Sequence, residues 1–280
     1  MLVDNESTYK NALERLSAYP RWTVDVETNG LDPYGVNQLC GVGIGIMDTD
    51  IEEIVTFYFP FRHQQGVNLE PSFLQDLMHV MSQREALLGY NLKFDLRFLE
   101  NEGLDISNIK LLDGMVLVRL TADSTVKELG LTKTIQRFYG EQAAQYDKDT
   151  KKYLMSNKWN KDFSESPPDI LGEYCEQDVY WTHRLYVDCL RKIEQSKQVA
   201  ILELEYELTG VLYEMERKGI RIDFDYAKHA RERILERQEQ VANSVYELAG
   251  KEFNIRSTQE VGEVFHELGI TSTVLTPKGK

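Results

Sequence analysis

The sequence contains few cysteines, no excess of basic residues and no long apolar run. Its three cysteines, Cys40, Cys175 and Cys189, have no spacing typical of a metal site, so reduced thiols in a reducing compartment are expected. A net charge of −14 excludes a surface that is basic throughout. No apolar stretch approaches the ~20 residues that cross a bilayer. The beginning, MLVDNESTYK, lacks the basic and apolar segments of a secretory signal, and a soluble intracellular protein is expected.

What is present is enough apolar sequence for a sizeable core. The chain has 280 residues, of which 42% are hydrophobic, and this suits one large domain or two ordinary ones. Alternation predicts strands at 21–28 and 39–48, β-branched and aromatic residues predict one at 52–61, and a short apolar run predicts one at 85–91. Helical spacing predicts helices at 8–18, 71–83 and 94–103. From about residue 199 only long helical patterns follow. We therefore predict an α/β domain over residues 1–195 and a helical segment over residues 196–280.

The stretch RWTVDVETNG places two acids on one face of a strand. Side chains at positions i and i+2 of a strand point to the same side, so Asp25 and Glu27 are expected ~7 Å apart along it. Two neighbouring carboxylates repel each other unless a proton or a cation relieves them. A strand face exposed to solvent explains the same pattern, because Asp-x-Glu is a common sequence.

Two further acids stand on predicted helices. Asp95 lies at the start of helix 94–103, where an acid also favours the helix dipole, and Asn91 ends the preceding strand. In EYCEQDVYWTHRLYVDCL, helical spacing predicts a stripe of residues on one helix face, and Asp178 is the only acid in it. Tyr174 lies on the same stripe, one turn before Asp178. A lone buried carboxylate is unfavourable without a partner or a metal ion. A half-exposed stripe in which Asp178 meets a lysine remains the alternative.

The four acids together are typical of a site for a hard metal ion. Carboxylate oxygens suit Mg²⁺ or Mn²⁺, and no cluster of histidine and cysteine in the sequence indicates zinc. Because Mg²⁺ usually keeps several waters, four carboxylates suit a pair of ions ~3.5–4 Å apart. Such pairs promote in-line displacement at phosphorus.

Three short motifs resemble those of the DEDD 3′-5′ exonucleases, in the same order. They are VDVET with Leu31 following, NLKFD around Asp95, and YCEQD, which ends at Asp178. Tyr174 stands four residues before Asp178, as in the DEDDy branch, whereas Glu173 occupies the place of the other branch's histidine. The resemblance covers roughly residues 18–192. It implies an RNase H-like exonuclease fold, with a mixed central sheet flanked by helices.

The second segment resembles the start of the thumb of family A DNA polymerases, the DNA polymerase I-like enzymes of bacteria and bacteriophages. The similar stretches are LELEYELTGVLYEMERKGIRID and AGKEFNIRSTQEVGEVFHELGI. The resemblance implies an all-α, thumb-like fragment and a cytoplasmic protein of a bacterial or phage-infected cell. No stretch resembles the palm or fingers, so this chain is not expected to polymerise by itself. It would be a piece of a longer polymerase, or a part whose palm and fingers are a separate chain.

By this resemblance, the first domain is the proofreading part of a DNA polymerase. It would hydrolyse the 3′ end of single-stranded DNA to nucleoside monophosphates with two divalent cations, Mg²⁺ or Mn²⁺. Asp25, Glu27 and Asp178 would hold the first ion. Asp25 would bridge to the second, which Asp95 reaches mostly through water. Tyr174, as a residue with an ordinary pKa of ~10, is a poor base at pH 7 and would orient the attacking water together with Glu27.

Contacts to the DNA are expected from residues near these motifs. Leu31 resembles the apolar residue that wedges against the terminal base, Asn91 resembles one that contacts the terminal nucleotide, and Lys93 flanks Asp95. Ordinary packing or capping explains Leu31 and Asn91 equally well. The stretch YDKDTKKYLMSNKWNK interleaves lysines with aromatic residues, which suits stacking of bases, but a solvated lysine-rich loop explains it as well.

Two other functions remain open. An RNase D-like RNA 3′ exonuclease shares all three motifs, although the segment after residue 199 resembles a polymerase thumb instead. A catalytically silent DNA-binding module is the second alternative, and the presence of all four acids argues against it.

Overall fold

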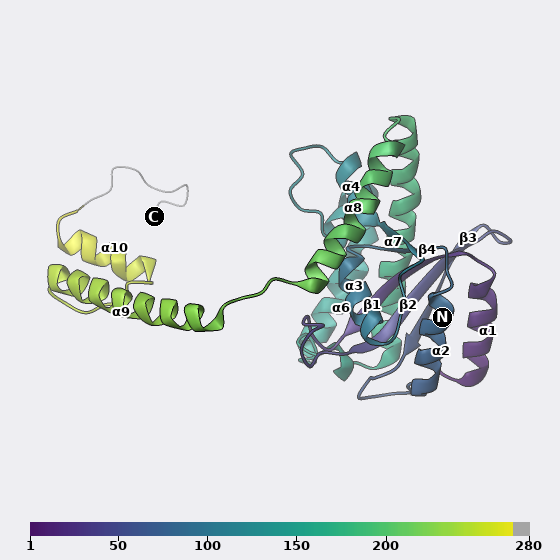
Figure 1. Cartoon of the computed structure of the whole chain (residues 1–280), viewed down its shortest axis with the longest axis horizontal. Coiled ribbons are helices and arrows are strands. Elements are labelled where there is room, and N and C mark those ends of the chain that lie inside the picture. Colours follow the sequence, from purple (N-terminus) through teal and green to yellow (C-terminus); the bar gives the residue numbers. More distant parts are fainter. Residues whose placement is uncertain (271–280) are drawn as a thin grey trace. The chain divides into compact units, whose positions relative to one another are not determined.

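The structure, a computed structural model, describes residues 1–270, which form two compact units (Figure 1). The first unit is Met1–Arg217, and the second begins at Lys218. Residues 271–280, the end of the predicted helical segment, lie outside the described residues. Within residues 1–270, no helix is both long and apolar enough to cross a membrane.

The first unit is built on a mixed five-stranded sheet. Its strands are β1 (Arg21–Thr28), β2 (Leu39–Asp48), β3 (Glu53–Pro60), β4 (Ala86–Gly89) and β5 (Lys110–Asp113). Their order in the sheet is β3-β2-β1-β4-β5, with β1 at the centre. The β1–β2 and β2–β3 pairs are antiparallel, whereas β4 runs parallel to β1 and to β5. The predicted mixed central sheet is confirmed. Strand β5 was not predicted, whereas β4, which has the same length, lies within the predicted strand 85–91.

Helices cover both faces of this sheet. In the first unit they are α1 (Glu6–Ser17), α2 (Pro71–Met81), α3 (Lys93–Asn101), α4 (Gly114–Thr121), α5 (Leu131–Tyr139), α6 (Gln145–Ser156), α7 (Pro168–Gln195) and α8 (Val199–Lys218). Alternate β1 residues Trp22, Val24 and Val26 enter the core cluster that α1, α2 and α3 share. The intervening residues face α7, since Thr23 and Asp25 contact its side chains. The period of two along β1 therefore separates a dry face from the polar one.

Strand β2 lets α7 approach this polar face closely. A Cβ on Gly43 would lie 2.6 Å from the Sγ atom of Cys175, and one on Gly45 would lie 2.5 Å from Val179. Any larger residue at these two positions would push the helix away from the sheet. The alternating glycines of LCGVGIGIMD thus fix the distance between β1 and the residues of α7.

Helix α8 packs against the rest of the first unit. Its residues Leu202, Tyr206 and Tyr213 are buried, and Tyr213 belongs to the same core cluster as the β1 residues. The compact unit therefore extends to Arg217, although the sequence pattern changes near residue 196. The division into domains at residues 195/196 stays a prediction.

The second unit contains the helices α9 (Phe224–Ala249) and α10 (Thr258–Glu267). Asp223 caps the start of α9, and Gly250 ends it in the left-handed conformation. Ser257 caps the start of α10 by accepting a hydrogen bond from the backbone of Glu260. The end of α9 at Gly250 and the serine cap of α10 agree with what glycine and serine predict from the sequence.

Candidate functional site

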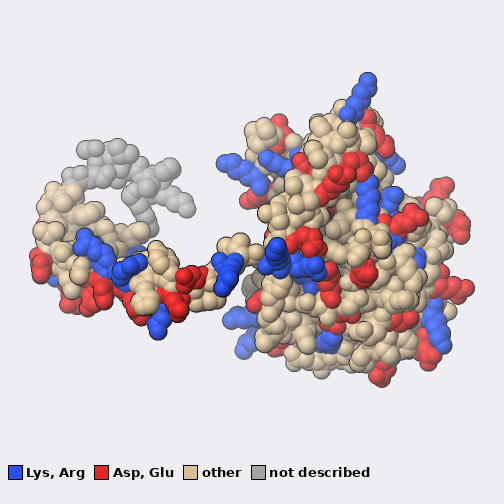
Figure 2. All heavy atoms as spheres, viewed as in Figure 1, with Lys and Arg blue, Asp and Glu red and all other residues tan. Residues whose placement is uncertain are grey.

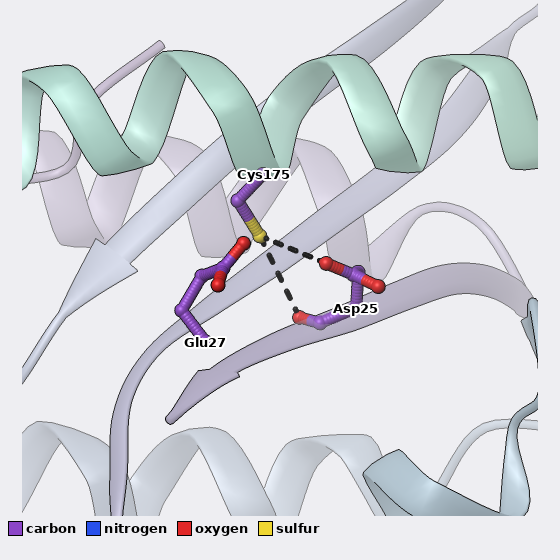
Figure 3. A group of neighbouring side chains, drawn as sticks. All are labelled: Asp25, Glu27 and Cys175. Carbon is purple, nitrogen blue, oxygen red and sulfur yellow. Dashed lines mark hydrogen bonds between the residues drawn. The ribbon is translucent and has the colours of Figure 1, made fainter. Parts of the chain in front are cut away.

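The Asp-x-Glu pair of β1 points at α7, as Figure 3 shows. Glu27 is only 5% exposed, and Asp25 is half-buried. The Sγ atom of Cys175, on α7, donates a weak hydrogen bond to Oδ2 of Asp25 at 3.4 Å. One ligand atom from each of these three residues lies within 4.8 Å of the others. The carboxyl groups are therefore placed closely enough to share one metal ion.

Asp95, on α3, also contacts strand β1. It stands in the first turn of α3, is 3% exposed, and accepts a hydrogen bond from the backbone N–H of Val26 at 3.1 Å. Strand β4 runs parallel to β1, so the helix that follows β4 begins at the edge where β1 ends. This topology brings a helix-initiating acid to the Asp-x-Glu pair.

Helix α7 contributes Asp178 and Tyr174, one helical turn apart. Both side chains are half-buried. The hydroxyl of Tyr146, on α6, donates to Oδ1 of Asp178 at 2.5 Å, and the hydroxyl of Tyr174 donates to Oδ1 of Asp147 at 3.1 Å. The structure thus places Asp178 and Tyr174 over β1, and it adds two α6 residues that the sequence did not single out.

The pKa values show that the four carboxyl groups act on one another. Burial, followed by the charge of Asp178, raises the pKa of Asp25 well above its ordinary value. Burial raises the pKa of Glu27 as well, and the charges of Asp25, Asp178 and Asp95 add to this increase. Burial and the charge of Asp25 raise the pKa of Asp95. Burial raises the pKa of Asp178 to about 7, against the lowering effect of the Tyr146 hydroxyl.

A divalent cation fits this arrangement. Buried carboxylates that raise one another's pKa have too little positive charge around them. Lys151 lowers the pKa of Glu27, but burial and the other acids raise it by more. Oxygen donors are the ligands that Mg²⁺ and Mn²⁺ prefer. Burial and the neighbouring acids also raise the pKa of the Cys175 thiol well above its ordinary value, so this side chain stays protonated near neutral pH.

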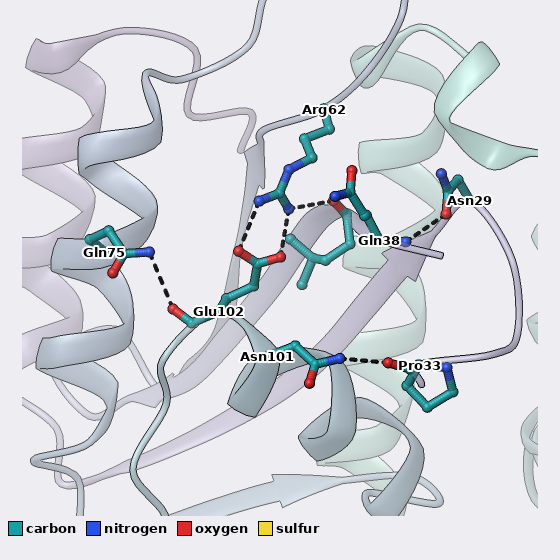
Figure 4. Close-up of polar contacts among 8 residues, drawn as sticks. Asn29, Pro33, Gln38, Arg62, Gln75, Asn101 and Glu102 are labelled. Atoms are coloured by element: carbon teal, nitrogen blue, oxygen red, sulfur yellow. Dashed lines mark hydrogen bonds and ion pairs between the residues drawn. The ribbon is translucent and has the colours of Figure 1, made fainter. Parts of the chain in front are cut away.

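Leu31 lies on the loop between β1 and β2, three residues after the end of β1, and it is 82% exposed. Polar contacts anchor the loop (Figure 4). Asn29 accepts a hydrogen bond from the backbone of Gln38 at 2.7 Å, and the side chain of Asn101, on α3, donates to the carbonyl of Pro33 at 2.7 Å. An exposed apolar side chain on an anchored loop is available to contact a base.

Asn91 and Lys93 lie around the start of α3 but make other contacts. Asn91 is exposed, has a φ of 61°, and its backbone N–H donates to Asp113 at 3.0 Å. The ammonium of Lys93 pairs with Glu216, on α8, at 2.5 Å, and Arg97 pairs with the same carboxylate. The structure therefore does not place Lys93 among the four acids, and its role toward DNA stays a prediction.

Most of the lysine-rich stretch lies in helix α6, whereas residues 157–161, which include Lys158 and Lys161, follow the helix in turns. Lys151 pairs with Asp147 at 2.6 Å and Lys148 pairs with Glu141 at 2.6 Å. Figure 2 shows acidic and basic side chains intermingled on the face of the first unit in view. Because two of the lysines are paired with acids, α6 is not a row of unpaired positive charge.

His183 is buried and does not join the acids. Its Nδ1 atom lies 2.7 Å from the hydroxyl of Thr23, and burial lowers the pKa of His183 to about 4. The imidazole is therefore neutral at physiological pH, as part of the packing between α7 and β1. His183 also follows Asp178 in the sequence and does not occupy the histidine position of the related branch.

The mixed sheet and its acidic site define an exonuclease-like α/β fold. A family model described as "3'-5' exonuclease" matches residues 1–194, and the chain belongs to this family. The predicted resemblance is confirmed.

Relatives of the chain are named DNA polymerases. DNA polymerase I of Synechocystis sp. is 28% identical over 251 residues, which cover 88% of this chain and 24% of that protein. DNA polymerase DpoZ of Acinetobacter phage SH-Ab 15497 is 23% identical over 264 residues, which cover 91% of this chain and 40% of that protein. The chain thus spans about a quarter of the length of the bacterial relative and two fifths of the phage relative.

A solved structure shares the fold. It is described as "POL domain of Pol1 from M. smegmatis complex with DNA primer-template and dNTP", and the match has a TM-score of 0.63 at 16% sequence identity. The match covers 100% of this chain and 43% of that chain. At this identity the likeness shows the fold alone.

Proposed function

We propose that the first unit is a metal-dependent 3′-5′ exonuclease that removes nucleoside monophosphates from the 3′ end of single-stranded DNA, as the proofreading part of a DNA polymerase. The observation that carries this proposal is the convergence of Asp25, Glu27, Asp95 and Asp178 in a family-matched exonuclease domain. The names of the relatives favour DNA over RNA as the substrate.

The chain's own residues supply binding sites and orientation. When bound, divalent cations would activate a water and stabilise charge on the departing 3′ oxygen. Asp25, Glu27 and Asp178 are the proposed ligands of one cation, and Asp25 with Asp95 serves a second. The hydrogen bond from Val26 keeps Asp95 turned toward β1.

Tyr174 does not act as a base in this proposal. Burial and the charge of Asp178 raise the pKa of Tyr174 further above its ordinary value of 10. Its hydroxyl therefore keeps its proton at neutral pH and orients the attacking water by a hydrogen bond. Accordingly, Tyr174→Phe should retain more activity than Asp25→Ala, which removes a ligand.

A matched assay on DNA and RNA tests the proposal. Single strands of the same sequence, labelled at the 5′ end, are incubated with Mg²⁺ or Mn²⁺ and with wild type or Asp25→Ala. Stepwise shortening of DNA that needs the metal and disappears in Asp25→Ala is the expected result. Faster shortening of RNA would indicate an RNA-trimming enzyme. DNA binding without cleavage by the wild type would indicate a silent binding module and contradict the proposal.

A further inference from the structure

Two adjacent residues of α6 face the candidate site and have no role in the account above. Tyr146 donates to Asp178 at 2.5 Å, and Asp147 accepts from Tyr174 at 3.1 Å. The aromatic rings of Tyr146 and Tyr174 lie 6.1 Å apart. Each α6 residue therefore contacts a different one of the two α7 side chains that face the acids.

Asp147 is not an ordinary surface acid. Its residue is only 5% exposed, and its Oδ1 atom receives both the hydroxyl of Tyr174 and, at 2.6 Å, the ammonium of Lys151. A buried carboxylate is unfavourable unless it is paired and hydrogen-bonded. Lys151 offsets the charge of Asp147, and the same Oδ1 atom accepts the hydrogen bond from Tyr174.

The direction of this hydrogen bond decides what Tyr174 can offer a water. A phenol has one proton to donate and oxygen lone pairs that accept. Because the proton of Tyr174 is directed to Asp147, its oxygen remains as an acceptor. A water at this oxygen would donate one hydrogen bond to Tyr174. The lone pair of the water would then point away from Tyr174, toward another partner. An acceptor can therefore orient a nucleophilic water without removing its proton.

We propose that α6 carries two positioning residues for the exonuclease reaction. Asp147, paired with Lys151, fixes the hydroxyl of Tyr174 as a hydrogen-bond acceptor for the attacking water. Tyr146 fixes the rotamer of Asp178 from the same helix. This inference rests on the proposed function, since the positioned groups serve its attacking water and its metal ligand.

Kinetics of single and double variants test the role of Asp147. Asp147→Ala removes the acceptor and should lower kcat about tenfold with little change in KM, as Tyr174→Phe should. Because Asp147 acts through Tyr174, the double variant should be no slower than Tyr174→Phe alone. Asp147→Asn keeps an acceptor oxygen and should recover part of the loss. Asp149→Ala, on an exposed acid two residues later, is the matched control and should keep wild-type activity.

A second measurement separates positioning from metal binding and from folding. Mn²⁺ affinity, measured by electron paramagnetic resonance, should agree within about threefold between Asp147→Ala and wild type, because Asp147 is not a proposed ligand. In metal-free protein, the effects of Asp147→Ala and Tyr174→Phe on the free energy of unfolding should be non-additive, because the two residues are in contact.

Several results would overturn the inference. They are full activity of Asp147→Ala, multiplicative losses in the double variant, or a large loss of Mn²⁺ affinity. If the wild type itself shortens no DNA, the proposed function fails and this inference fails with it. An active wild type beside a fully active Asp147→Ala overturns the inference alone.

Discussion

At the scale of single residues, burial makes the acids of the site destabilise the folded protein as the pH rises. Acids that pair with a cation at the surface do the opposite. Burial raises the pKa of Asp178 to about 7, whereas an unfolded aspartate titrates near ~3.9. Between these two pH values the folded protein binds more protons than the unfolded chain. The contribution of Asp178 to stability is therefore present below about pH 4 and is lost as the pH rises to about 7.

We expect Asp178→Asn to be more stable than the wild type at pH 8 in the absence of metal. The difference in unfolding free energy should grow by up to ~1.4 kcal/mol per pH unit between about pH 4 and pH 7. The variant comparison is needed because His183, whose pKa is lowered to about 4, changes wild-type stability in the opposite direction. Urea unfolding at several pH values measures the difference.

Saturating Mg²⁺ or Mn²⁺ should reverse this order. A cation bound to the folded state stabilises the wild type, and Asp178→Asn loses a ligand. A wild type that is more stable than Asp178→Asn at pH 8 without metal would show that the buried charge of Asp178 does not destabilise the folded protein.

The acids were predictable from the sequence because their residue types and spacing carry chemistry directly. The roles of Tyr146 and Asp147 were not, because a tyrosine and an aspartate in a lysine-rich stretch have many uses. Only the packing of α6 against α7 brings these residues to Asp178 and Tyr174. Likewise, the partner of Lys93 is a glutamate 123 residues away, which no local pattern indicates.

At the scale of elements, the distance between α7 and β2 sets the geometry of the site. We expect Gly43→Ala to destabilise the protein by ~1–3 kcal/mol, since the added Cβ would lie 2.6 Å from Cys175 and 2.9 Å from Val179. Mn²⁺ affinity should fall as well, because α7 carries Asp178. Gly210→Ala, in α8, has no neighbour within 4 Å of its Cβ and should be neutral or slightly stabilising. Equal stability of the two variants would contradict this.

Helix α8 supplies the carboxylate that pairs with two cations of α3. Glu216 pairs with Lys93 and Arg97, so Glu216→Gln should leave both cations for phosphate groups and tighten binding of single-stranded DNA. The salt dependence of binding should steepen in the same variant. Glu214→Gln is the control, because Glu214 pairs with Arg217 on its own helix. Fluorescence anisotropy at several salt concentrations measures both, and equal affinities would remove Lys93 from the DNA contacts.

Most of the long elements followed the sequence patterns, whereas the short strand β5 did not. Strands β1 and β2 alternate in sequence, β3 is rich in β-branched and aromatic residues, and α9 ends at a glycine, so local signals indicated these elements. Strand β5 has four residues, and its place beside β4 follows from parallel pairing, which is a tertiary contact. The lysine-rich segment became α6 because Tyr146, Asp147 and Leu154 pack inward, which its polar composition obscured.

At the scale of the whole molecule, the change in sequence pattern and the limit of the compact unit do not coincide. A chain ending at residue 195 would lack Leu202, Tyr206 and Tyr213, each worth ~1.5–3 kcal/mol when fully buried. We expect residues 1–218 to unfold at the same urea midpoint as the first unit of the full chain, and residues 1–195 at a clearly lower one. Equal midpoints for the two fragments would support a domain that ends near residue 195.

The central claim is that acids from β1, α3 and α7 form one site for divalent cations. A titration of metal-free protein with Mn²⁺, followed by electron paramagnetic resonance, tests it directly. We expect two ions per wild-type chain, loss of both in Asp25→Asn, and no change in the exposed control Asp149→Asn. A wild type that binds no Mn²⁺, or an Asp25→Asn variant that still binds two ions, would contradict it.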